Sequence, residues 1–403
     1  MEKMNNTRTR FFIILLIISF IFPILGLLLT SFFYFFAKGK KTAIITSILF
    51  GVLIAFFAYN FIPDSKFDLV RHQALVNSYS EVHDVDSFVS VYKSSGMELI
   101  PQLYSFVISR IGDVNLLQFF PVAIGYSALF YILVDYKNKI KLKNYKFIPV
   151  FILVLFGQST LYYFSGLYNY TAINLFALAF YLDYFKTKKF SPCILYVSTF
   201  FIHTSMVLPI GLLMLYKLCN SKSIKRPVVF GILGVCVLLL LLLFGGVGEY
   251  LIPNIINPLR KMFLSYAGNN ERFSRFYRGF GLVVDLIKIG LILMNCWLLR
   301  KDKNNSSAKK FVLFLSIVVV ALLPISIVVI RFASLALFLS IPMLMDLIND
   351  DKRRHQYVLM VYVLVAILFT GYNIRSIYQY GYKNFIINKI TLTLPELLEE
   401  GNK

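Results

Sequence analysis

Long apolar blocks separated by short polar stretches run through almost the whole chain. Most blocks are about 20 residues long, the length that a helix needs to cross the hydrocarbon core of a bilayer. They predict an all-α, polytopic transmembrane helical bundle of about 10–12 membrane-embedded segments, organised as one integral membrane domain over residues 1–403. The predicted segments are residues 11–36, 42–62, 116–136, 147–164, 171–185, 191–216, 228–246, 281–299, 311–330, 332–347 and 357–372.

Composition and charge support the same class of protein. The 403 residues are 58% hydrophobic and 15% charged, whereas soluble domains are about half apolar and a quarter charged. The formal net charge of +21 would suggest nucleic-acid binding in a soluble protein. Here most Lys and Arg residues lie in short loops between apolar blocks, which is the pattern of loops retained in the cytoplasm. We therefore expect no nucleic-acid partner.

Loop charge also predicts which side of the membrane each loop occupies. A run of lysines follows the block 116–136 at once and indicates a cytoplasmic loop. The stretch 63–115 carries more acidic than basic residues, so it is predicted to be an external loop, as is 247–279. Within 63–115, residues 99–111 are apolar but too short to span a bilayer, which favours an interfacial or re-entrant segment.

Two regions fit these loop charges less simply. The topology puts both termini outside, and the N-terminal Lys3, Arg8 and Arg10 oppose that placement. Residues 191–216 have basic residues on both flanks, so a single span would put one basic loop outside. A pair of short segments broken near His203 would keep both loops inside, and irregular backbone at membrane depth is tolerated where it faces protein or a wet cavity.

The first candidate for chemistry follows the second apolar block. Asp68 and Arg71 are three residues apart and would share one face of a helix. The two side chains could form a structural salt bridge. Together with the adjacent His72, they could instead form an acid–base and anion-binding group.

A second candidate lies in the predicted external loop 247–279. Arg272, Arg275 and Arg278 recur at intervals of three. Guanidinium groups gathered on one external face suit a phosphate or pyrophosphate, although such a run can also be a solvated face. Arg331, at the junction of two apolar blocks, could belong to the same anion site or could extend toward the lipid headgroups.

No metal or cofactor is expected. The four cysteines have no spacing suited to zinc or to a disulfide framework. Nucleotide-binding and hydrolase motifs are absent from the sequence, which excludes a primary pump driven by ATP. His203 lies in an otherwise apolar segment, where it is either a hydrogen-bonded core residue or part of a functional cavity.

The order of several short motifs resembles the EpsG family of Wzy-like capsular and exopolysaccharide polymerases, over roughly residues 10 to 380. The motifs are Phe61-Ile-Pro-Asp-Ser-Lys-Phe-Asp-Leu-Val-Arg71, Ile111-Gly-Asp-Val-Asn-Leu-Leu-Gln-Phe-Phe120, Phe164-Ser-Gly-Leu-Tyr-Asn169, Ala177-Leu-Ala-Phe-Tyr-Leu-Asp-Tyr184, Phe201-Ile-His-Thr-Ser205 and Arg331-Phe-Ala-Ser334. The resemblance implies a membrane glycosyltransferase of the bacterial inner (cytoplasmic) membrane, which makes a surface polysaccharide such as capsule or O-antigen.

The resemblance also implies the reaction and the partners. A glycan on undecaprenyl diphosphate is the donor, and a repeat unit on the same lipid is the acceptor. Transfer inverts the anomeric centre at the outer face of the membrane and needs no metal or nucleotide sugar. Expected partners are undecaprenyl-diphosphate-linked oligosaccharide, the lipid bilayer, and a chain-length regulator and flippase of the same pathway.

Residue roles follow from the same resemblance. Arginines would hold the leaving diphosphate, and a carboxylate or histidine would deprotonate the acceptor hydroxyl. For that base we rank Asp68 first, then His203, then Glu98. The family usually has an arginine in the turn where this chain has Tyr168, so the missing charge would come from elsewhere, with Arg331 or Arg272 as candidates.

Two other classes use the same lipid-linked substrates. A flippase would line a cavity within the membrane with its charges and would alternate its access. The sequence has no clear inverted repeat, and its best charges lie outside the apolar blocks, which favours an enzyme. A ligase or acyltransferase with the same donor is the other alternative.

Overall fold

The computed structural model describes a little more than half of the chain. The described residues are 14–61, 68–95, 99–156, 163–220 and 306–350, with some internal gaps, and parts of 287–299, 357–371 and 395–396. Every regular element in this part of the chain is a helix, so the predicted all-α class is confirmed. The helices are α2 (Pro23–Phe36), α3 (Lys40–Tyr59), α4 (Asp68–Ser80), α5 (Val85–Ser95), α6 (Leu99–Ile111), α7 (Leu116–Ile140), α8 (Asn144–Phe156), α10 (Leu167–Tyr184), α11 (Phe190–Ile202), η1 (Thr204–Met206), α12 (Val207–Asn220), α18 (Ser307–Ala321) and α19 (Ser326–Asn349).

The helices belong to two compact units. The first comprises Met1–Met206 and Phe338–Lys403, and the second comprises Val207–Leu337. The first unit therefore contains helices α2 to η1 and the C-terminal part of α19, whereas the second contains α12, α18 and the start of α19. That the whole chain forms one integral membrane domain stays a prediction.

Three helices of the described part are long and apolar enough to cross a membrane. They are Lys40–Tyr59, Leu116–Ile140 and Arg331–Asn349, and shorter apolar helices cover Asn144–Leu155, Phe190–Ile202 and Thr204–Cys219. This set of helices is that of an all-α membrane protein. The predicted segment 228–246 and the predicted external loop 247–279 lie outside the described residues, and the segments 281–299 and 357–372 are described only in part.

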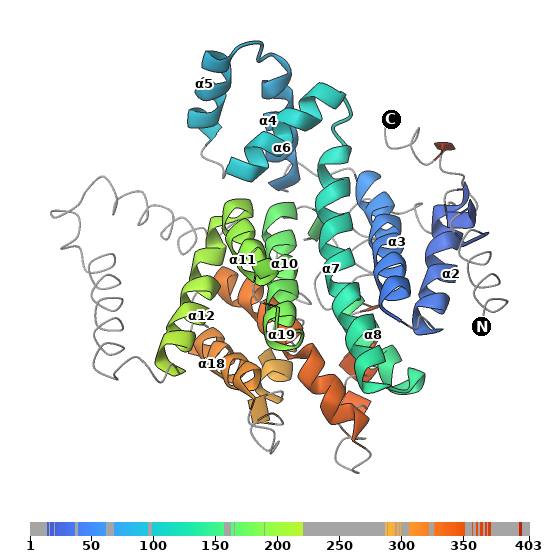
Figure 1. Ribbon diagram of the computed structural model, residues 1–403. Coiled ribbons are helices and arrows are strands. Elements are labelled where there is room, and N and C mark those ends of the chain that lie inside the picture. Colours follow the sequence, from blue (N-terminus) through green and yellow to red (C-terminus); the bar gives the residue numbers. More distant parts are fainter. Residues whose placement is uncertain are drawn as a thin grey trace. The chain divides into compact units, whose positions relative to one another are not determined.

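Close packing of α3 against α7 forms the framework of the first unit, and Figure 1 shows these two helices side by side. A Cβ atom added at Gly51 would lie 2.2 Å from Oγ of Ser127 and 2.5 Å from the carbonyl oxygen of Ala123. Only glycine fits there, because such distances are shorter than any van der Waals contact. Next to this contact, the rings of Phe50 and Phe130 meet edge to face, with 4.3 Å between their centroids. Both contacts join the middle of α3 to α7.

Helices α4, α5 and α6 pack together around a second apolar cluster (Figure 1). The buried ring of Tyr79 stacks on Phe88 at 5.4 Å, and its hydroxyl donates to Oε1 of Gln102 at 2.5 Å. The guanidinium group of Arg110 donates to the carbonyl oxygens of Tyr79 and Val82, which caps the end of α4. This cap satisfies carbonyl groups that a helix end otherwise leaves without donors.

The predicted external loop 63–115 is largely helical where it is described, and its external position stays a prediction. Loop charge gives the side of the membrane and does not exclude helix. Within this stretch, the bounds predicted for the short apolar segment 99–111 agree with those of α6. That α6 lies at the membrane interface stays a prediction.

The predicted break near His203 is confirmed. Helix α11 ends at Ile202, and the 3₁₀ turn of η1 follows at Thr204–Met206. Nδ1 of His203 accepts a hydrogen bond from the backbone N–H of Ser205 at 3.2 Å. A side chain that accepts a backbone hydrogen bond competes with the helical ladder, which accounts for the end of α11 at this position.

Two boundaries were predicted wrongly. The outer turn expected at residues 165–170 is mostly the first turn of α10, which begins at Leu167. Arg331 is not at the junction of two helices, because it lies in α19, which begins five residues earlier. A proline, Pro324, lies between the end of α18 and the start of α19, and proline disfavours helix for the residue before it.

Candidate functional site

The N-terminal end of α10 brings together polar and aromatic side chains from three helices of the first unit. The ring of His72 on α4 meets the ring of Tyr168 on α10 edge to face, with 4.9 Å between centroids. Tyr104 on α6 approaches the other side, with its ring centroid 6.4 Å from that of Tyr168. His72 and Tyr168 are each only 5% exposed, so this group is packed against protein.

A hydrogen-bonded chain begins at the next residue of α10. Oδ1 of Asn169 accepts a hydrogen bond from Oγ of Ser205 at 3.2 Å. Oγ of Ser205 also lies 2.8 Å from Nδ1 of His203, which accepts from the Ser205 backbone N–H. Because Nδ1 is an acceptor in that bond, we assign the proton of the neutral ring to Nε2. The helix break thus places His203 next to the start of α10.

Proline in α7 explains how Tyr104 is held. Pro121 has no N–H to donate to the carbonyl of Leu117, so the usual helical bond is lost at that point. The hydroxyl of Tyr104 donates instead to the carbonyl oxygens of Leu117 at 3.2 Å and Leu116 at 2.6 Å. Burial, and to a smaller extent the neighbouring Tyr168, raise the pKa of Tyr104 well above its usual value. The phenol therefore keeps its proton and acts as a donor.

The same proline attaches α10 to α7. The carbonyl oxygen of Pro121 accepts hydrogen bonds from Oγ1 of Thr171 at 3.0 Å and from the hydroxyl of Tyr163 at 3.2 Å. Thr171 lies within the first two turns of α10, so this contact fixes the end of the helix that carries Tyr168 and Asn169. The two helices that flank the site, α6 and α10, are thus both attached to α7 at Pro121 and at the carbonyl group that it leaves without a donor.

The structure brings some of the predicted site residues together and leaves others apart. His72, Tyr168 and His203 all lie around the start of α10. Asp68 and Arg71 are exposed on α4, and no ion pair joins them in the described part of the chain. His72, by contrast, is buried. The three residues that the sequence suggested as one acid–base and anion-binding group therefore do not share one environment.

The remaining predicted residues are not placed at this site. Arg331 is half-buried in the part of α19 that belongs to the second unit. The other predicted residues, Glu98, Arg272, Arg275 and Arg278, lie outside the described residues.

Sequence reasoning missed three members of the site. Tyr104 and Asn169 stand among apolar and aromatic residues, where nothing in the one-dimensional pattern separates a site residue from a core residue. Ser205 was noticed only as part of the helix break. The proline at position 121 was a usable signal, because a mid-helix proline leaves a carbonyl that a nearby hydroxyl can satisfy.

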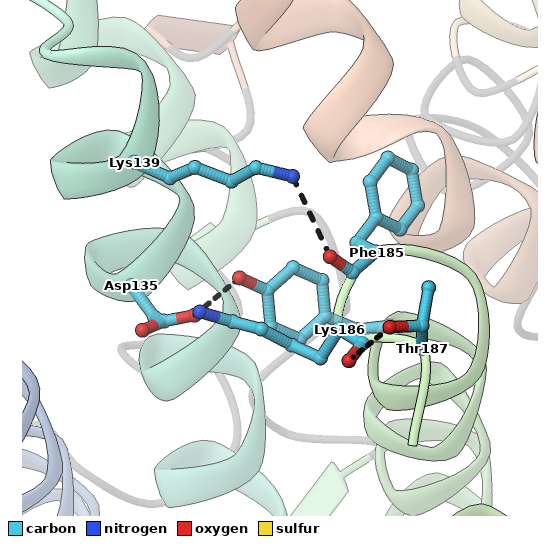
Figure 2. Close-up of polar contacts among 6 residues, drawn as sticks. Asp135, Lys139, Phe185, Lys186 and Thr187 are labelled. Atoms are coloured by element: carbon cyan, nitrogen blue, oxygen red, sulfur yellow. Dashed lines mark hydrogen bonds and ion pairs between the residues drawn. The ribbon is translucent and has the colours of Figure 1, made fainter. Parts of the chain in front are cut away.

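A basic cluster lies at the opposite end of α10. Nζ of Lys186 lies 2.6 Å from Oδ2 of Asp135 on α7, and the same carboxylate accepts a hydrogen bond from Tyr181. Figure 2 shows Lys186 reaching from the end of α10 to Asp135, with Lys139 of α7 donating to the carbonyl oxygen of Phe185 at 3.4 Å. These contacts bring the lysine-rich loops that follow α7 and α10 to the same end of the unit.

The length of α10 separates the two ends by about one membrane thickness. Its 18 residues span about 27 Å at 1.5 Å per residue, close to the roughly 30 Å of a hydrocarbon core. The polar site at Tyr168 and Asn169 and the basic cluster at Lys186 therefore lie at opposite ends of α10, which is long enough to cross a membrane but is not among the described helices that are also apolar enough.

These features define an all-α membrane protein with a polar and aromatic site at the end of a membrane-length helix that is remote from its basic loops. Among known protein families, the EpsG family matches residues 72–387. The chain therefore belongs to the EpsG family, and the family predicted from sequence is confirmed. Its function is exopolysaccharide polymerase-like and belongs to polysaccharide biosynthesis.

No curated protein and no solved structure matches the chain. The matched residues include His72, Tyr168, Asn169 and His203, whereas Asp68 and Arg71 lie just before them. Most of the buried site is thus within the part of the chain that defines the family.

Proposed function

We propose that the protein polymerises a surface polysaccharide by joining repeat units carried on undecaprenyl diphosphate, at the outer face of the bacterial inner membrane. The observation that carries this proposal is the position of the site around Tyr168 and His203, at the end of α10 remote from the Lys186 cluster. Basic loops are retained in the cytoplasm, so the site at the other end would face outward. Membership of the EpsG family supports the class of substrate.

The residue types around the site suit a lipid-linked glycan. Aromatic rings such as that of Tyr104 offer apolar faces to sugars, and buried amides and hydroxyls supply hydrogen bonds to sugar oxygens. Arg71, exposed on α4 beside His72, would bind an oxygen of the diphosphate. It would replace the charge that the family usually supplies at the position of Tyr168.

Other cations predicted from sequence would bind phosphate groups of the lipid-linked substrates. They are Arg272, Arg275, Arg278 and Arg331. Their guanidinium groups would offset the negative charge that grows on the leaving diphosphate during transfer.

The reaction follows from the chemistry of the leaving group. The oxygen of an acceptor hydroxyl attacks the anomeric carbon of the donor sugar from the face opposite the diphosphate. The bond between that carbon and the diphosphate oxygen breaks, and its electron pair leaves with the diphosphate. The configuration at carbon inverts, and the acceptor proton passes to a base. The proposed reaction needs no metal, so polymer synthesis should continue in the presence of EDTA.

Asp68 is the proposed base. A positioned base contributes roughly 10²–10⁴ in rate to such a step, and a carboxylate can accept the proton directly. Its exposed position at the start of α4 leaves it open to a substrate that arrives along the membrane surface. His203 is the second candidate, but its Nδ1 already accepts from the Ser205 backbone N–H, so we assign the proton of the neutral ring to Nε2, which makes that nitrogen a donor.

The proposal is tested in cells that lack the chromosomal gene and carry it on a plasmid. The wild-type gene should give a ladder of glycan lengths, whereas Asp68→Asn should give glycan of one repeat unit at an unchanged protein level. Asp86→Asn is the matched control, because Asp86 is also an exposed acid on this part of the chain, and it should give the wild-type ladder. A ladder from Asp68→Asn would pass the role of base to His203 or Glu98, and a single unit from the wild type would contradict polymerisation itself.

The proposed reaction also implies which other proteins act with this one. A separate flippase must deliver the lipid-linked units to the outer face, and a chain-length regulator would control the ladder. Loss of that flippase should abolish the polymer even when this protein is present at its normal level.

A further inference from the structure

Asn169 carries a buried donor that the fold does not use. Its side chain is only 4% exposed, and its Oδ1 accepts from Ser205. Its Nδ2 has no hydrogen-bond partner among the described residues. A buried donor left in this state costs about 1–3 kcal/mol, so a native protein that keeps one calls for an explanation, such as a bound ligand.

The donor lies in the first turn of a long helix. Asn169 is the third residue of α10, which runs for 18 residues. The first N–H groups of a helix have no acceptor within the helix, and the aligned peptide dipoles make that end electropositive. The residue before the helix is Gly166, and no side chain caps this end. This electropositive end of α10 therefore has no side-chain cap from the residue that precedes it.

Residues 167–171 at this end of α10 are buried, and the positions that border them are a glycine and an exposed threonine. Gly166 has no side chain to cover the first turn, and Thr204, next to Ser205, is exposed. The ring of Tyr168 is turned toward His72, so it packs against α4. The break between α11 and η1 borders the other side through Ser205.

We infer that the start of α10 binds the diphosphate of the lipid-linked substrate, with Nδ2 of Asn169 donating to one of its oxygens. This inference rests on the proposed function and adds the residue and the helix end that hold the leaving group. Helix N-termini bind phosphate groups through backbone N–H donors and the dipole. An amide nitrogen supplies only donors, which suits an anion better than it suits a carbonyl or an amine.

Ser205 sets the orientation of the Asn169 carboxamide. Its hydroxyl donates to Oδ1, and this bond turns Nδ2 to the opposite side of the amide. Ser205 is thus a positioning residue, and its loss should weaken binding less than loss of the donor.

The test measures binding of three probes by purified full-length protein: undecaprenyl diphosphate, undecaprenyl monophosphate and inorganic pyrophosphate. Asn169→Asp keeps an acceptor for Ser205 but loses the donor and adds a like charge. Asn169→Ala loses the donor without adding charge. Both should bind undecaprenyl diphosphate roughly 10- to 100-fold more weakly than wild type, the range expected for a lost hydrogen bond to a charged group. Ser205→Ala should stay within roughly 3-fold, because it loses only a neutral hydrogen bond.

A matched control separates the site from a general effect on the helix. Asn174 lies on the same helix, is fully buried, and donates to the hydroxyl of Tyr163 at 3.3 Å. Asn174→Asp should alter thermal stability while undecaprenyl diphosphate binding changes less than in Asn169→Asp. Equal binding by wild type, Asn169→Asp and Asn169→Ala would overturn the inference, as would a wild type that binds none of the probes.

The three binding probes and a cell assay distinguish diphosphate binding at the start of α10 from the proposed polymerase function. Binding of pyrophosphate as tight as that of undecaprenyl diphosphate would assign the site to free pyrophosphate and overturn the lipid assignment. If the wild type binds the lipid through Asn169 yet makes no glycan ladder in cells, the inference stands and the proposed polymerase function fails. A normal ladder from cells carrying Asn169→Ala would instead overturn the inference and leave the polymerase function intact.

Discussion

Tyr104→Phe removes one hydroxyl from the contact between α6 and α7 and should destabilise the first unit. That hydroxyl donates to the carbonyl oxygens of Leu116 at 2.6 Å and Leu117 at 3.2 Å. The carbonyl of Leu117 cannot receive its helical hydrogen bond because residue 121 is proline. A carbonyl deprived of its donor costs about 1–3 kcal/mol, so we expect a loss of about 1.5 kcal/mol in the free energy of unfolding.

A second substitution tests this explanation directly. Pro121→Ala restores an N–H that can donate to Leu117. In that background Tyr104→Phe should cost only about 0.5 kcal/mol, which gives a coupling energy of about 1 kcal/mol, within the range for residues in one hydrogen-bond network. The four proteins are compared by equilibrium unfolding in mixed micelles. Additive effects, within about 0.5 kcal/mol, would refute the link between the proline and the tyrosine.

Three further predictions concern other parts of the first unit. A cysteine at Ser80 should react with an impermeant thiol reagent in spheroplasts and one at Lys141 should not, because these exposed positions fall on opposite sides in the proposed topology; the reverse labelling would overturn it. Asp135→Asn should cost about 1–2 kcal/mol in unfolding free energy, less than a fully buried pair because the Lys186 side chain is 31% exposed, and an unchanged stability would show that the pair is incidental. The backbone N–H of Ser87 donates to Asp84 and lowers the pKa of that carboxyl from its usual 3.8, so this cap should stabilise α5 above pH 3.8 and be lost as the pH falls through the lowered pKa. The protection factors of α5 amides against hydrogen exchange, which correct for the intrinsic pH dependence of exchange, should then fall at acid pH in wild type but change less in Asp84→Asn.

Much of the helical framework could be predicted from the apolar pattern. Residues 99–111 were delimited correctly as α6, because polar residues bound the apolar run on both sides. The break at His203 was also predicted, from basic residues on both flanks and not from local propensity. Both signals lie in the sequence itself: one in hydropathy, the other in loop charge.

Other features depend on contacts that no linear pattern encodes. The turn expected before Thr171 is helical from Leu167 onward, since the tyrosines there are buried against other helices. Asp68 and His72 are neighbours on α4, yet one is exposed and the other is buried against Tyr168. Their different exposure follows from the ring contact of His72 with Tyr168, which joins residues far apart in the sequence.

The central claim is that the protein forms glycosidic bonds between lipid-linked repeat units. In the most direct measurement, purified protein in liposomes receives an undecaprenyl-diphosphate-linked repeat unit in the presence of EDTA. The masses of the products are then determined by mass spectrometry. The account predicts glycans of two or more units, with one undecaprenyl diphosphate released for each new bond. Lipid-linked single units that cross the bilayer without forming any new bond would contradict the claim and indicate a transporter.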